Sequence, residues 1–165
     1  MKRMNESMSE TKRILDQLKR AYEGEAWHGP SLRDILADVT AAQAAAHPLP
    51  NAHSTWELVL HIAAWENAAR KVLEGLPINV PPEENFPTIS DTSEAAWHDA
   101  LATLETVHHG LRDAIARITD ADLDTVVDNK DTGRRYSVYS LLHGVVQHDL
   151  YHAGQIVMLK KALNA

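Results

Sequence analysis

The sequence predicts an all-α protein: a four-helix bundle with long crossover connections and short extra helices between the first and second long helices. Apolar residues recur at spacings of three and four along four long stretches, which is typical of helices that bury one face. A segment with four prolines (76–90) and the turn sequence NKDTG (129–133) separate these stretches, and no segment has the pattern of a substantial sheet. A chain of 165 residues suits one domain, 1–165, with a real core.

The first part of the chain is expected to hold one long helix and two short ones. The long helix covers about residues 9–22. Its inward face is formed by Ile14, Leu15, Leu18 and Tyr22. In the connection that follows, Ser31 with Asp34 starts one short helix, and Thr40 with Gln43 forms a capping box that starts the other.

The second long helix is expected over residues 54–75. Ser54 and Glu57 form a capping box at its start, and Gly75 follows its end. The prolines of 76–90 then favour an extended crossover, because proline disfavours both helix and sheet interiors.

Two further long helices complete the bundle. Asp91 with Glu94 is expected to open the third, which continues to about Ile118. The segment 123–136 follows, with short strand-like flanks around the NKDTG turn. The fourth helix starts near Ser137 and reaches nearly to the C-terminus.

The composition excludes several classes of function. The formal net charge is −7 and no basic block occurs, which disfavours a nucleic-acid partner. There is no cysteine, so disulfides, thiolate metal ligands and a cysteine nucleophile are excluded. The N-terminal stretch lacks the apolar core of a signal peptide, and no apolar run is long enough to span a bilayer. We therefore expect a cytoplasmic protein without a membrane partner.

The most informative feature is a histidine pair within HDLYHAGQI (148–156). His148 and His152 are four residues apart, so they lie one turn from each other on one face of a helix and are able to hold one ion. A Zn²⁺ or Ni²⁺ ion needs at least a third ligand from another helix, and His61 is the best-placed candidate. The alternative is a pair of hydrogen-bonded core histidines, which spacing alone leaves open.

A metalloprotease site is the less favoured interpretation of the same pair. Asp149 makes the string His-Asp-x-x-His, close to the HExxH motif. However, 13 residues follow His152, which leaves little room for a downstream ligand, and Asp is shorter than the usual Glu base.

Two longer motifs carry a resemblance to a known family. STWELVLHIAAWE (54–66) and LLHGVVQHDLYHAGQI (141–156), in this order, resemble the DinB/YfiT-like superfamily of metalloenzymes. The segment WHGPSL (27–32) and the four-helix layout are also similar, so that the resemblance covers essentially the whole chain.

The resemblance implies a four-helix bundle with one divalent metal ion held by three histidines. Carried over by position, these ligands are His61, His148 and His152, whereas His143 matches a histidine that does not bind the metal. The resemblance also implies pairing into homodimers. The last turns of the final helix are apolar on more than one side, in agreement with a homodimer (Val157, Met158, Leu159, Ala162 and Leu163).

Several residues near these histidines are candidates for supporting roles. Gln155 follows His152 by three positions, so it is expected to orient a ligand or a bound water. His108 lies on the inward face of the third helix and is a candidate for contact with a cofactor or substrate, with a hydrogen-bonded core histidine as the alternative. Gly154, and Gly144 likewise, is expected to permit close approach of a neighbouring helix, because a glycine inside a helix costs about 1 kcal/mol against alanine.

A three-histidine site with an open position supports two reactions on a small-molecule substrate. The metal lowers the pKa of a bound water in a hydrolase, or binds the thiolate of a low-molecular-weight thiol in an S-transferase. Asp149 is the first candidate for the base, although it is equally able to accept a hydrogen bond from a ligand histidine. Glu57 and Glu66 are the other carboxylates near the ligands in sequence. The alternative function is a non-catalytic metal-binding helical module that acts through its surface or its dimer interface.

Overall fold

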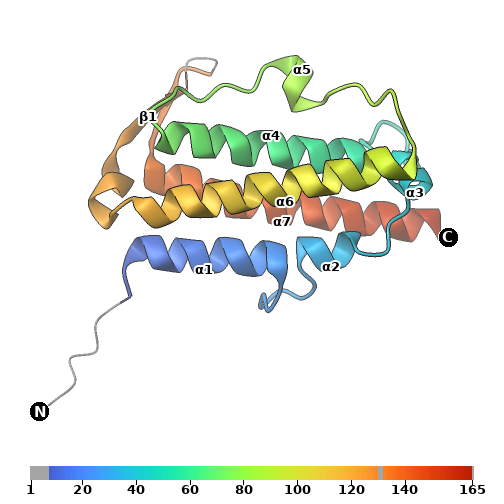
Figure 1. The fold of residues 1–165 in the computed structure, drawn as a ribbon, viewed down its shortest axis with the longest axis horizontal. Coiled ribbons are helices and arrows are strands. Elements are labelled where there is room, and N and C mark those ends of the chain that lie inside the picture. The colour runs from blue at the N-terminus through green and yellow to red at the C-terminus, as the bar shows by residue number, and fades with distance from the viewer. Residues whose placement is uncertain (1–7, 130–131, 165) are drawn as a thin grey trace, which may run out of the picture.

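The computed structural model describes residues 8–129 and 132–164, and it confirms the all-helical bundle (Figure 1). The four long helices are α1 (Glu10–Glu23), α4 (Thr55–Leu73), α6 (Glu94–Arg117) and α7 (Val138–Leu163). Helix α4 packs against α6 and α7, and α1 packs against the same two helices. This arrangement brings α4 and α7, which carry the histidine motifs, into direct contact. Within the described residues, no helix is long and apolar enough to cross a membrane.

The predicted capping boxes form and set the starts of three helices. Ser31 caps α2 (Leu32–Leu36), Thr40 caps α3 (Ala41–Ala45) and Ser54 caps α4. At α4, the Ser54 hydroxyl accepts a hydrogen bond from the backbone N–H of Glu57 (3.2 Å), and the Glu57 carboxylate accepts one from the N–H of Ser54 (2.7 Å). The Glu57 side chain is therefore engaged at the helix start.

The predicted start of the third long helix was wrong by a few residues. Ser93, not Asp91, is the N-cap of α6, because its hydroxyl accepts a hydrogen bond from the N–H of Ala96 (3.2 Å). Asp91 accepts instead from the N–H of Ser93 (2.9 Å), and Glu94 accepts from the N–H of Ala41 in α3 (3.0 Å). The Glu94 side chain therefore makes a long-range contact with α3 and does not form the expected capping box with Asp91.

The two connections differ in their structure. The crossover 76–90 contains the one-turn helix α5 (Pro82–Asn85) and runs along α4 (Figure 1). Proline at the first helical position favours such a turn, which the expectation of an extended crossover had missed. After the 3₁₀ helix η1 (Asp120–Asp124), strands β1 (Val126–Asn129) and β2 (Arg134–Ser137) pair antiparallel, as the strand-like flanks predicted. Part of the NKDTG turn, 130–131, lies outside the described residues.

The core consists of two apolar clusters separated by a layer of buried polar residues. One cluster is centred on Trp97, which is fully buried and donates a hydrogen bond to the Val39 carbonyl (2.7 Å). The other includes Ile14, Leu111 and Leu142. On three of the long helices, one buried polar residue lies between the residues of one cluster and those of the other. These residues are Glu66 on α4, His108 on α6 and Asp149 on α7.

Candidate metal site

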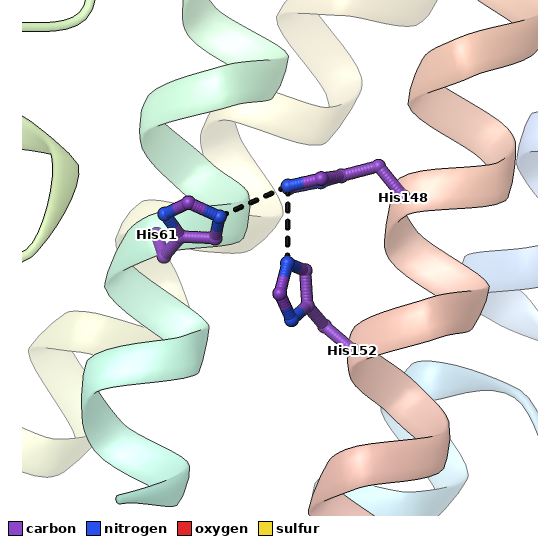
Figure 2. A group of neighbouring side chains, drawn as sticks. All are labelled: His61, His148 and His152. Carbon is purple, nitrogen blue, oxygen red and sulfur yellow. Dashed lines mark hydrogen bonds between the residues drawn. The ribbon is translucent and has the colours of Figure 1, made fainter. Parts of the chain in front are cut away.

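Three histidines from two helices converge on one point (Figure 2). His148 Nε2 lies 3.0 Å from His61 Nε2 and 3.1 Å from His152 Nε2. One ring nitrogen of each histidine lies within 4.8 Å of the others. His148 and His152 lie one turn apart on one face of α7, and the packing of α4 against α7 supplies His61. The three residues singled out by the sequence are therefore brought together.

Hydrogen bonds at the far side of two rings determine where their protons lie. His61 Nδ1 is 3.0 Å from the backbone carbonyl of Asn85, and His152 Nδ1 is 2.7 Å from Oε1 of Gln155. An oxygen of this kind accepts, so both Nδ1 atoms donate and carry the proton in the neutral ring. The Nε2 atoms of His61 and His152 therefore present lone pairs toward His148.

This arrangement of three ring nitrogens fits a metal ion. Two lone pairs face His148 Nε2, and a neutral His148 has at most one proton there to share between them. One cation at this point satisfies all three nitrogens. The two Nε2 separations are close to the value of about 3.4 Å that two nitrogens have around a tetrahedral zinc ion. The site thus fits a divalent metal ion.

The electrostatic surroundings keep these ligands ready to bind. Burial lowers the pKa of His61, His148 and His152, because the charged imidazolium loses its hydration there. Neutral imidazole is the form that binds a metal, so all three rings are competent at neutral pH.

The crossover contributes two residues that the sequence interpretation missed. Besides its carbonyl bond to His61, Asn85 accepts a hydrogen bond at Oδ1 from Nε1 of Trp65 (2.9 Å). The ring of Phe86 stacks on His61, with centroids 4.3 Å apart, and on His53, with centroids 3.7 Å apart. Phe86 is the only phenylalanine in the chain, but no local pattern places it beside the histidines.

Asp149, the sequence candidate for a base, lies in the polar layer of the core. Its side chain is 2% exposed and lines neither of the cavities beside the site. Its Oδ1 is 3.8 Å from His148 Nδ1. Burial raises the pKa of Asp149 well above its ordinary value, and the neighbouring Glu66 raises it further.

His108, the second supporting candidate, is also in this layer. Both His108 and Glu66 are fully buried, and His108 Nδ1 lies 2.9 Å from Glu66 Oε1. Burial raises the pKa of Glu66 to about 8 and lowers the pKa of His108 to about 3. At neutral pH this contact therefore joins a protonated carboxyl, which donates, to a neutral imidazole, which accepts.

The other histidines lie outside the cluster. His143 faces Glu10, with 3.8 Å between Nε2 and Oε1, and His109 is exposed beside Glu105. His53 is half exposed, and its stacking on Phe86 places it at the edge of the site.

Two cavities flank the histidine cluster along α7. One, of about 560 Å³, reaches Gln155 and Tyr151. The other, of about 370 Å³, reaches His148 and Trp65. The lining residues of both cavities are mainly apolar and include no Asp, Glu, Lys or Arg. Such surfaces suit uncharged molecules, because a charged group bound there would lose hydration without gaining a counterion.

The two glycines of α7 do not serve close helix packing, so that expectation was wrong. A Cβ built on Gly144 or Gly154 meets no atom within 4 Å. Each glycine instead lines one cavity: Gly154 the larger and Gly144 the smaller. The open space beside these glycines is therefore part of the cavities.

Gly144→Ala and Gly154→Ala should accordingly stabilise the protein. Each replacement removes a helix-interior glycine without a clash, so the free energy of unfolding should rise by up to about 1 kcal/mol, or about 2–4 °C in melting temperature. Thermal unfolding measures this. Gly110→Ala in α6 is the matched control and should gain less, because its Cβ would lie 3.2 Å from Arg70 Cδ. A fall in melting temperature on either α7 replacement would contradict the statement that open space borders these two glycines.

Comparison with known proteins agrees with the helical bundle. The model of the DinB superfamily matches residues 26–156, and the chain belongs to this superfamily. No curated protein matches the chain in sequence.

Two solved structures share the fold. YfiT from Bacillus subtilis, described as a "probable metal-dependent hydrolase with an unusual four-helix bundle topology", aligns with a TM-score of 0.76 and 16% identity, over 99% of this chain and 94% of YfiT. A conserved protein from Enterococcus faecalis aligns with a TM-score of 0.70 and 19% identity, over 94% of this chain and 98% of that protein.

Proposed function

We propose that His61, His148 and His152 bind one divalent metal ion, Zn²⁺ or Ni²⁺, and that the protein is a metal-dependent hydrolase of an uncharged small molecule. The observation that carries the proposal is the convergence of three Nε2 atoms. Two of them present lone pairs, and the third has at most one proton to donate to both. The description of YfiT as a "probable metal-dependent hydrolase" supports the same class of reaction.

The bound ion would act as a Lewis acid and lower the pKa of a water molecule toward neutrality. The protein's own residues hold the ligands in place for this. The carbonyl of Asn85 and the amide of Gln155 keep the Nδ1 protons of His61 and His152, so that Nε2 stays free. The cavities beside Gln155 and His148 then hold the apolar parts of a substrate next to the ion.

The test is a comparison of metal-loaded and metal-free protein on a matched substrate panel. Neutral aryl and alkyl esters and amides should be hydrolysed only by the protein loaded with Zn²⁺ or Ni²⁺, and phosphate esters should be poor substrates. Elemental analysis of untagged protein should show one metal ion per chain. Hydrolysis that persists without metal would overturn the proposal.

The same panel, repeated with low-molecular-weight thiols, separates the related alternatives. Metal-dependent transfer to the thiol, with no hydrolysis, would assign a thiol S-transferase. Stoichiometric metal with neither reaction would instead assign a non-catalytic metal-binding module. Light scattering of the same preparation tests the homodimer, which stays a prediction.

A further inference from the structure

We propose that Glu66 is a positioning residue of the metal site, which acts through Asp149 to orient His148. This inference rests on the proposed binding of a metal by the three histidines. It concerns the polar layer between the two apolar clusters of the core, which the proposed reaction does not otherwise use.

The layer forms a chain of contacts from the histidine cluster into the middle of the bundle. Asp149 Oδ1 lies 3.8 Å from His148 Nδ1, and the Asp149 carboxyl is close enough to Glu66 for each acid to affect the pKa of the other. Glu66 is held in turn by His108, with 2.9 Å between Oε1 and Nδ1. The His108 ring stacks on Tyr22 of α1, with centroids 4.0 Å apart. All four long helices therefore contribute to this chain.

Stability alone does not explain these buried acids. Glu66 is fully buried and Asp149 is 2% exposed, and no Lys or Arg among the described residues pairs with either. Glu66 Oε2 and both carboxyl oxygens of Asp149 have no hydrogen-bond partner. A buried polar group without a partner costs free energy. A role at the adjacent site accounts for this cost.

His148 is the ligand that needs such support. The Nδ1 atoms of His61 and His152 have hydrogen-bond acceptors, whereas His148 Nδ1 is buried without one. Asp149 Oδ1 lies 3.8 Å from this nitrogen, slightly beyond hydrogen-bonding distance. Metal-bound histidines almost always donate their second N–H to an acceptor. Glu66, itself fixed by His108, limits where the Asp149 carboxyl lies and so keeps it beside His148.

The test is a set of metal affinities measured with a competing chromophoric chelator, together with melting temperatures of the metal-free proteins. Glu66→Met should lower the affinity for Zn²⁺ about 10- to 100-fold, which is the usual effect of losing such support. The metal-free melting temperature should fall by several degrees, because His108 Nδ1 is then buried without its partner. Glu66→Gln keeps the shape and polar atoms, so it should retain most of the affinity. Leu111→Ala, a cavity in the neighbouring core, should lower the melting temperature and leave the affinity unchanged.

A double-mutant cycle tests whether Glu66 acts through Asp149. Asp149→Asn should also weaken Zn²⁺ binding, and adding Glu66→Met to it should cause no further loss. Losses that multiply would overturn the inference, as would a Glu66→Met protein with wild-type affinity. If Glu66→Met does not fold, His108→Gln replaces it in the cycle, with the same expected pattern. A wild-type protein that binds no metal would refute the proposed function itself. A wild-type protein that binds metal, with the same affinity in the Glu66→Met variant, would refute only this inference.

Discussion

Replacing His61, His148 or His152 with Ala will remove most of the metal-dependent increase in thermal stability. The unfolded chain lacks the assembled site, so metal binding adds to the free energy of unfolding of the native form only. At a free metal concentration of about 1,000 times Kd this increment is about 4 kcal/mol, or about 8–16 °C for a chain of this size. Thermal unfolding with Zn²⁺ and with chelator measures the increment in each variant.

The controls come from histidines outside the cluster. His143→Ala and His109→Ala should keep the full response to chelator, since neither side chain lies near the three Nε2 atoms. A merely structural histidine pair would give a different pattern, with destabilisation on replacement and no metal-dependent component to lose. If His61→Ala retains one metal ion per chain and the full response, the proposed inter-helix site is wrong.

Acidification will release the metal over the range in which the three histidines become protonated. Burial lowers the pKa of each ligand below its ordinary value of about 6.5, so at neutral pH the rings are already neutral and metal affinity should be nearly independent of pH. As the pH falls through the lowered pKa values, each protonated ring should weaken binding by up to about tenfold per pH unit.

The metal-free protein provides the control for this titration. Its unfolded state binds protons at the three histidines below about pH 6.5, before the folded state does, so its stability should also fall as the pH is lowered through this window. Metal affinity measured at each pH separates the two effects. An affinity that already falls steeply with pH above about pH 6.5 would show that burial does not lower these pKa values.

The sequence by itself determined the features that arise from local interactions. The capping boxes at Ser31, Thr40 and Ser54 were predicted because a side chain and a backbone N–H three residues apart meet in any helix start. The spacing of His148 and His152 placed both on one face of α7 for the same reason. His61 required more: its place on the inward face of α4 suggested it, and the family resemblance selected it.

Only the tertiary structure decided which polar residues are buried and what they contact. Glu66 carries no local sign of burial, since glutamate is almost always exposed on a helix, yet the packing of four helices encloses it. Asn85 and Phe86 reach His61 because of the path of the crossover, which joins residues 24 and 25 positions apart in the chain. Gly154 looked like a packing glycine and borders open space. Each of these features depends on which elements distant in sequence come into contact. Helical spacing describes positions within one helix, so it carries no information about such contacts.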